Sequence, residues 1–265
     1  MPGNQLRFED GAAYERMMGV WSRLVGEVFL DWVAPPPGLR WLDVGCGSGA
    51  FSELVSGRCA AAEIQGLDPS GAQLAYARSR PVGKIAQFHQ GDALKLPFPD
   101  NRFDAAAMAL VIFFVPDPAK AVGEMARVVV PGGIVAAYAW DRPGSSGGGV
   151  PTEPIQAELR AMGFAPPIPP SADAARIEAL RTLWTGAGIE AVETREIAVT
   201  RSFADFDEFW TTTASGASIA PFVAALSADL TEALKARVRA RLPATGAGHI
   251  TYAAHANAIK GRLPK

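Results

Sequence analysis

The chain is poor in cysteine and histidine and has no excess of charge of either sign. Cys46 and Cys59 are the only cysteines among 265 residues. Two thiols cannot build the disulfide framework of a small secreted domain, and they cannot supply four zinc ligands. The formal net charge is −2, so the chain offers no positive field to a phosphate backbone. We therefore expect neither a nucleic-acid partner nor a bound metal.

Long apolar segments are also missing. No run is long enough and free enough of charge to span a bilayer, and the start, MPGNQLRFEDGAAYERM, lacks the apolar stretch of a secretory signal. With the sparse cysteines, these absences predict a cytoplasmic protein without a membrane span. Hydrophobic residues make up 49% of the chain, which suits the core of one large α/β domain with an insertion.

The most informative segment reads WLDVGCGSGAF over residues 41–51. It predicts a buried strand over 41–44, a turn built on Gly45, Gly47 and Gly49, and the start of a helix. Glycines have no Cβ, so the backbone turns sharply and a ligand can approach it closely. The free N–H groups at the start of the helix favour an anion. The segment therefore predicts a cradle for a nucleotide-type cofactor.

Two carboxylates accompany this turn. Asp43 lies two residues before the first glycine, and Asp68 closes the next apolar run. Strand and helix patterns alternate from Trp41 to Trp140, which predicts a parallel sheet that binds its ligand at the carboxyl ends of the strands. Gly45, Gly47 and Ala50 also fit the fingerprint G-x-G-x-x-G/A, in which Asp68 would bind an NAD ribose. An NAD(P)-binding Rossmann oxidoreductase is therefore one interpretation of this sequence pattern.

Further downstream, residues 91–133 read GDALKLPFPDNRFDAAAMALVIFFVPDPAKAVGEMARVVVPGG. Together with the glycine turn, this stretch resembles the class I S-adenosylmethionine-dependent methyltransferases. It is most similar to the small-molecule branch near the ubiquinone/menaquinone-type enzymes (methyltransferase domain type 11). The third glycine, Gly49, and the acidic Asp43 favour this resemblance over the NAD fingerprint. A non-catalytic protein that binds S-adenosylmethionine is a further alternative.

The resemblance implies a fold and a reaction. The fold is a Rossmann-like doubly wound seven-stranded sheet, mostly parallel with an antiparallel last strand, plus a helical cap insertion. The reaction is the in-line transfer of a methyl group from S-adenosylmethionine to a small, partly apolar molecule. Residues 1–38 would form a helical cover and residues 39–141 the cofactor-binding core. Residues 142–265 would supply cap helices and the last two strands of the same sheet.

The resemblance also implies roles for single residues. The glycine turn would hold the methionine carboxylate and Asp43 the amino-acid end, while Asp68 would accept both ribose hydroxyls. Asp92 would accept from the adenine amino group, and Leu110 would lie beside the sulfonium. The expected cofactor-binding residues are Asp43, Gly45, Cys46, Gly47, Ser48, Gly49, Asp68, Pro69, Ser70, Gly91, Asp92, Ala93, Leu94 and Leu110.

The acceptor side carries less sequence information. The aromatic candidates for a substrate pocket are Tyr14, Trp21, Phe113, Phe114 and Trp210. No residue matches a catalytic motif. Asp141 follows the fifth predicted strand, and His249 falls on the last predicted strand. These two residues are the candidates for a general base, if the acceptor needs one.

Local signals also place the elements. Asp117 with Pro118 predicts a capped helix that runs to Val130. The third strand is expected over Lys84–Gln90 and the fifth over Ile134–Trp140. Apolar residues predict one long helix over Ile219–Leu242 and a last strand over His249–Ile259.

Overall fold

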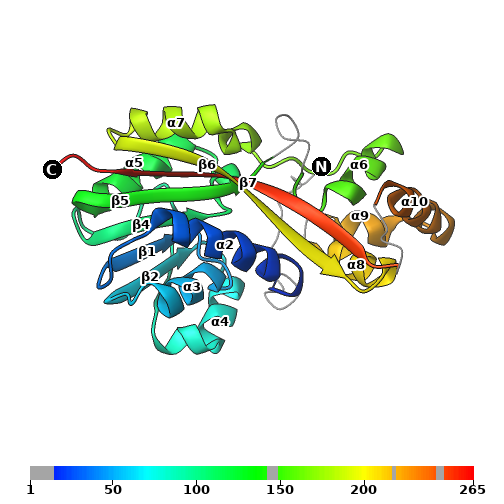
Figure 1. Ribbon diagram of the computed structural model, residues 1–265, viewed down its shortest axis with the longest axis horizontal. Coiled ribbons are helices and arrows are strands. Elements are labelled where there is room, and N and C mark those ends of the chain that lie inside the picture. Colours follow the sequence, from blue (N-terminus) through cyan, green and yellow to red (C-terminus); the bar gives the residue numbers. More distant parts are fainter. Residues whose placement is uncertain (1–14, 142–148, 217–218, 243–247) are drawn as a thin grey trace.

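The computed structural model describes residues 15–141, 149–216, 219–242 and 248–265. Their centre is a seven-stranded sheet in the order β3-β2-β1-β4-β5-β7-β6 (Figure 1). The first five strands run parallel, and β7 is antiparallel to both of its neighbours. The expected fold class is confirmed. The strands are β1 Arg40–Val44, β2 Glu63–Asp68, β3 Gln87–Gln90, β4 Phe103–Ala109, β5 Val129–Trp140, β6 Glu190–Phe203 and β7 Ile250–Arg262.

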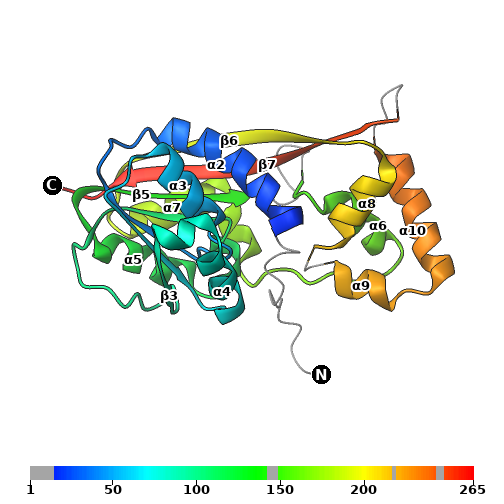
Figure 2. The same ribbon diagram turned by 90° about the horizontal axis from the view of Figure 1, so that it is seen from below.

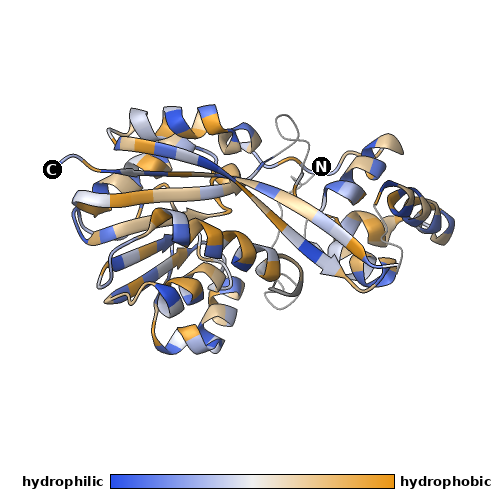
Figure 3. Ribbon diagram, viewed as in Figure 1, coloured by the Kyte–Doolittle hydropathy of each residue, from blue (hydrophilic) through white to orange (hydrophobic). Residues whose placement is uncertain are grey.

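Helices cover both faces of this sheet. One face carries α2 and α3, which pack on each other, and the other carries α5 and α7 (Figure 2). The helices show alternating hydrophilic and hydrophobic residues, as expected when one side is buried (Figure 3). The helices are α2 Val20–Val33, α3 Ala50–Arg58, α4 Gly71–Ser79, α5 Pro118–Val128, α6 Glu153–Ala161, α7 Ile177–Gly186, α8 Phe206–Ala214, α9 Ala220–Ala225 and α10 Ala228–Arg241. A short π-helix, η1 Glu15–Gly19, precedes α2, and three 3-10 helices are η2 Pro81–Lys84, η3 Ile112–Phe114 and η4 Ala172–Ala175.

The last two strands are longer than the sheet that they extend. Pairing between β5 and β7 ends at Trp140 and Ala256, whereas pairing between β6 and β7 continues to Phe203 and Ile250. The outer half of β6 and β7 is therefore a two-stranded ribbon. Figures 1 and 2 show that this ribbon leads from the sheet to a separate group of helices, α6, α8, α9 and α10. We call this helix group the cap.

The prediction of a single helix over Ile219–Leu242 is wrong. The chain forms α9 and α10, and Leu226 between them has an extended backbone. The Ser227 side chain accepts a hydrogen bond from the Leu230 N–H and caps α10. Serine favours this cap position over a helix interior, because its hydroxyl replaces the missing backbone acceptor.

Three strand boundaries also differ from the prediction. Lys84 belongs to the 3-10 helix η2, so β3 begins only at Gln87. Helix α5 has its predicted cap, since Asp117 accepts from the Lys120 N–H, but it ends at Val128. β5 then starts at Val129 instead of Ile134, because the Pro131–Gly133 stretch continues the strand with a shift in register. β7 continues three residues beyond its predicted end at Ile259.

Three properties bear on the predicted class of protein. Both cysteines are free and buried. Within the described ranges, no helix has the length and apolar character needed to cross a membrane. The same ranges hold no group of three or more potential metal ligands.

Candidate cofactor and acceptor site

The glycine turn follows β1 and needs glycine at its first position. Gly45, Gly47 and Gly49 have φ angles of 75°, 49° and 80°, a region that other residues rarely adopt. The Gly45 N–H donates to the Leu67 carbonyl at 2.7 Å, which ties the turn to β2. A Cβ on Gly45 would lie 2.5 Å from Cγ2 of Val111. The Val111 side chain, just after β4, therefore packs directly against Gly45 and leaves no room for a side chain there.

Asp68 connects this turn to the end of β2. Its Oδ2 accepts from the Gly47 N–H at 2.9 Å and its Oδ1 from the Ser70 N–H at 2.8 Å. Burial raises the pKa of Asp68, and the two N–H donors act in the opposite direction. Each carboxylate oxygen has two lone pairs, so both can accept one more donor. Asp68 is therefore positioned by the backbone and can still receive a ligand.

Asp43 lies beneath the turn and is 2% exposed. Its Oδ2 accepts from the Ser52 hydroxyl at 2.6 Å. Its Oδ1 is buried and has no hydrogen-bond partner among the described residues. Burial, with a contribution from the charge of Asp68, raises the pKa of Asp43 to about 7 against the effect of Ser52. A buried oxygen without a donor is costly, so the site has an acceptor to offer to a ligand.

The raised pKa of Asp43 predicts how stability depends on pH. A carboxyl whose pKa is about 7 when folded and near 3.8 when unfolded loses stability as the pH rises between those values. Asp43→Asn removes this loss. The free energy of unfolding of the variant, relative to the natural protein, should therefore increase from pH 4 to pH 8 by up to about 4 kcal/mol. Urea titrations at both pH values measure it, and equal differences at both would contradict the raised pKa.

The loop after β3 lies next to Asp68. The Gly91 N–H donates to the Asp68 carbonyl at 3.2 Å. Asp92 is exposed, and its Oδ1 accepts from the Leu94 N–H at 2.9 Å. Asp92 thus stabilises its own turn, a common role for this residue. Its contact with adenine stays a prediction.

Leu110 directly follows β4 and has a conformation unusual for leucine. Its φ is 63°, it is buried, and its N–H donates to the Tyr138 carbonyl at 2.8 Å. A left-handed leucine is strained, and such strain is concentrated at functional sites. The remaining predicted cofactor residues frame the same strand ends: Cys46 and Ser48 are buried, Ala93 is half-buried, Pro69 is exposed, and Ser70 caps α4.

The aromatic acceptor candidates lie in three places. Trp21 is buried and makes edge contacts with Trp140 at 6.5 Å between ring centres. Phe113 and Phe114 are adjacent in η3, after β4, with ring centres 4.4 Å apart. Trp210 stacks on another aromatic ring inside the cap. Tyr14 lies outside the described residues.

The two candidates for a general base are far apart. Asp141 directly follows β5 and is 2% exposed. His249 is exposed and precedes β7 at the outer end of the ribbon. It lies seven positions before Ala256, the partner of Trp140, which corresponds to roughly 20 Å of extended strand. Only Asp141 therefore lies at the sheet edge.

Asn257 is a site residue that the sequence patterns did not single out. Its Nδ2 donates to Oδ1 of Asp141 at 3.1 Å and to the Ala175 carbonyl at 3.0 Å. Its Oδ1 is buried and, in the described part of the chain, has no hydrogen-bond partner. The available signal was a lone amide within an alanine-rich strand, where a buried polar group needs a partner.

Comparison with known proteins identifies the segment that carries the turn. Residues 42–137 match the model of the family described as "Methyltransferase domain". These residues belong to the methyltransferase domain family. The match runs from β1 into β5. It includes the carboxyl ends of β1, β2, β3 and β4, but it stops before the end of β5.

Relatives of this methyltransferase domain include two quinone enzymes. Demethylmenaquinone methyltransferase of Desulfitobacterium hafniense is 38% identical over 116 residues, 42% of this chain and 46% of that protein. The 2-phytyl-1,4-naphtoquinone methyltransferase of Synechocystis is 40% identical over 135 residues, 48% of this chain and 54% of that protein. The chain thus spans about half the length of the curated relatives that it matches.

Solved structures share the fold over most of the chain. The YcgJ protein from Bacillus subtilis has a TM-score of 0.60 at 19% identity, covering 91% of this chain and 98% of that one. A putative methyltransferase from Bacillus halodurans has a TM-score of 0.59 at 17% identity, covering 91% and 99%. The ribbon and the cap lie outside the segment matched by the methyltransferase domain family.

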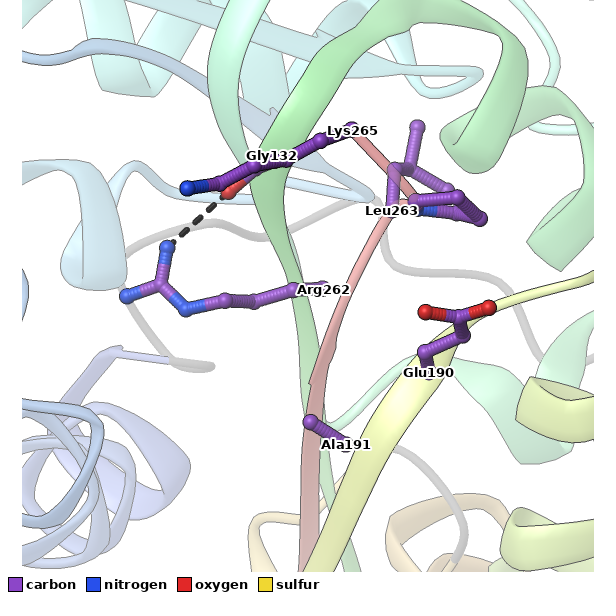
Figure 4. A pocket seen from close by; sticks show the side chains of 7 residues that line it. Gly132, Glu190, Ala191, Arg262, Leu263 and Lys265 are labelled. Carbon is purple, nitrogen blue, oxygen red and sulfur yellow. Dashed lines mark hydrogen bonds between the residues drawn. The ribbon is translucent and has the colours of Figure 1, made fainter.

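A cavity of about 360 Å³ lies at the other end of the sheet. It is formed where β5 and β6 begin and β7 ends (Figure 4). The carboxyl ends of the parallel strands, which carry the glycine turn of the methyltransferase domain, are at the opposite edge. This cavity is therefore separate from the candidate site. Its lining residues are Gly132, Glu190, Ala191, Arg262, Leu263, Pro264 and Lys265.

Proposed function

We propose that the chain is an S-adenosylmethionine-dependent methyltransferase that acts on a small, partly apolar molecule. The main support is the glycine turn held between two buried carboxylates, inside a segment that matches a methyltransferase domain. Relatives named as quinone methyltransferases support an acceptor of this kind. Phosphoethanolamine N-methyltransferase 2 of Haemonchus contortus, with a TM-score of 0.56 at 17% identity, was solved in complex with S-adenosyl-L-methionine.

The chemistry of the residues fits this cofactor. The free N–H groups after the glycine turn suit its carboxylate, and the buried Oδ1 of Asp43 suits its ammonium group. Asp68 accepts the ribose hydroxyls with its remaining lone pairs, and Asp92 accepts from the adenine amino group. Leu110 excludes water beside the sulfonium. When bound, the cofactor supplies an activated methyl group.

The remaining task of the protein is to align the acceptor and to take up its proton. Asn257 orients Asp141 through a hydrogen bond, and the carboxylate of Asp141 receives the proton of an acidic O–H or N–H as that atom attacks the methyl carbon. Alignment of two reactants contributes effective molarities of about 10⁵ M or more. Residues 1–38 act as a helical cover and residues 39–141 as the cofactor-binding core. Residues 142–265 supply the cap and the last two strands of the same sheet. The buried free thiols accord with a reducing cytoplasm.

Calorimetry tests the cofactor assignment directly. S-adenosylhomocysteine should bind with a Kd in the micromolar range (~8 kcal/mol), and NADH should give no heat above dilution. Incubation of a metabolite extract with methyl-labelled cofactor, followed by mass spectrometry, should yield a labelled product. Binding of NADH alone would contradict the proposal. Binding of S-adenosylhomocysteine without any labelled product would favour a non-catalytic binding protein.

Asp141→Asn should lower kcat for the labelled acceptor by about 100-fold or more, because proton transfer by a positioned side chain contributes on this scale. The affinity for S-adenosylhomocysteine should stay within about twofold, as Asp141 lies beyond the glycine turn. Asp173→Asn, a change of an exposed carboxylate in η4, is the matched control and should leave kcat unchanged. An equal loss in both variants would exclude Asp141 as the base.

A further inference from the structure

Arg201 lies on the ribbon, directly opposite Tyr252. The register of β6 and β7 pairs these two residues, and paired residues share one face of a two-stranded ribbon. Val199 and Phe203, two positions to either side on β6, are buried, so this face is turned inward. Arg201 is therefore half-buried on the inner face, in the segment that leads from the sheet edge to the cap (Figure 2).

Aromatic rings cover the same inner face. The Tyr252 ring makes edge contacts with Trp21 at 6.4 Å and with Phe209 at 6.4 Å between ring centres. Trp21 in turn contacts Trp140, the last residue of β5. The rings thus form a continuous apolar series from Trp140, at the end of β5, to α8 of the cap. Trp21, Trp140 and Phe209 are buried, so the half-buried Tyr252 is the ring of this series that a flat apolar molecule could contact.

The guanidinium of Arg201 has no carboxylate partner in the described part of the chain. It donates one hydrogen bond, to the Met17 carbonyl at 3.2 Å, and its Cζ lies 4.8 Å from the centre of the Phe203 ring. Glu208 is the acid of the described ranges that acts on it from a distance, and that carboxylate accepts a hydrogen bond from the Ala204 N–H. Burial lowers the pKa of Arg201, so its charge is only partly solvated.

Other partly buried arginines of the chain differ from Arg201 in this respect. Three of them form an ion pair within 3 Å: Arg40 with Asp104, Arg102 with Glu63 and Arg127 with Glu124. Arg23 lies 3.9 Å from the carboxylate of Glu53. A desolvated charge without a counterion is costly, and a guanidinium fork matches a carboxylate or another planar oxyanion. The unpaired cation beside aromatic rings therefore points to an anion that comes with a ligand.

We propose that Arg201 binds an ionised acidic group of the methyl acceptor, and that the acceptor is an aromatic or similarly flat apolar acid. The proposal rests on the proposed function, since it assigns the acceptor class of that same site. The half-buried ring of Tyr252, backed by the buried ring of Trp21, contacts the flat part of the acceptor, and Arg201 selects its charge. The reacting atom is left at the sheet edge, where β5 ends.

Two aromatic probes of equal shape test this assignment. Calorimetry with 2-naphthoate and with its neutral amide, 2-naphthamide, is run on the full chain in saturating S-adenosylhomocysteine. The natural protein should bind the acid at least about tenfold more tightly than the amide, the scale of one charged hydrogen bond. In Arg201→Gln the ratio should fall to about 1. Arg195→Gln, an exposed arginine on the same strand, should keep the tenfold ratio.

Arg201→Lys separates charge from a structural role. It retains the cation but not the guanidinium fork, so we expect a ratio of acid to amide affinity between those of the natural protein and Arg201→Gln. It also replaces Arg201→Gln as the test variant if that variant does not fold. Equal binding of acid and amide by the natural protein, binding of neither probe, or a tenfold ratio that persists in Arg201→Gln would each overturn the inference. Failure to bind S-adenosylhomocysteine would instead overturn the proposed function.

Discussion

Asp68→Ala is expected to lower the affinity for S-adenosylhomocysteine by about 100-fold or more. Each hydrogen bond to a charged group contributes about 1.5–3 kcal/mol, and the variant removes the acceptor for two ribose hydroxyls. It also leaves the N–H groups of Gly47 and Ser70 without their acceptor, so the turn itself loosens. Calorimetry measures the affinity, and the loss should appear in Kd and not in the number of sites.

The control for this variant is Asp92→Ala. Asp92 is exposed and its side chain bonds only within its own turn, so the loss should be about tenfold or less. Circular dichroism should show that both variants remain folded, because Asp68 holds turns and not core packing. Unchanged affinity in Asp68→Ala would refute the role assigned to its carboxylate.

Gly45→Ala is expected to destabilise the protein by about 2–5 kcal/mol. A left-handed conformation costs an alanine about 1–2 kcal/mol, and overpacking adds about 1–3 kcal/mol. The overpacking arises because the new Cβ would lie 2.5 Å from Cγ2 of Val111. Urea unfolding measures the free energy, and binding of S-adenosylhomocysteine should be lost along with the shape of the turn.

Two further variants separate the conformational cost of Gly45→Ala from the cost of its clash with Val111. Gly38→Ala has a similar φ of 80° but meets no atom within 4 Å, so it should show only the conformational cost. Adding Val111→Ala to Gly45→Ala should remove the clash and recover part of the lost stability, beyond the cost of Val111→Ala alone. A full loss in Gly38→Ala would show that the contact with Val111 contributes nothing.

Elements with strong local chemistry could be predicted from the sequence. The glycine turn needs residues without a Cβ. The N-terminus of α5 needs a side-chain acceptor followed by proline. Both patterns are therefore specific. The break at Ser227 was missed because apolar residues continue past it with helical spacing, and a single hydroxyl outweighs that pattern. The start of β5 was misplaced because proline and glycine usually end a strand but here continue it through a shift in register.

The acceptor side could not be predicted in the same way. Arg201 and Tyr252 meet across strands whose register depends on tertiary packing, and a slip of one residue would move either side chain to the other face. Asn257 likewise reaches Asp141 only because β7 pairs with β5. The spacing of residues along the sequence does not predict such cross-strand pairs. The predicted cofactor residues differ, because they follow the ends of successive strands in chain order.

The outermost position of β6 has a consequence for solubility. β6 has a single neighbouring strand, so its other side exposes backbone groups that another molecule could pair with. Charged side chains are spaced along this border, and Glu193, Arg195 and Glu196 are all exposed. Such charges oppose the joining of two sheets edge to edge. A chain with these three residues neutralised should therefore aggregate at concentrations at which the natural chain stays dispersed.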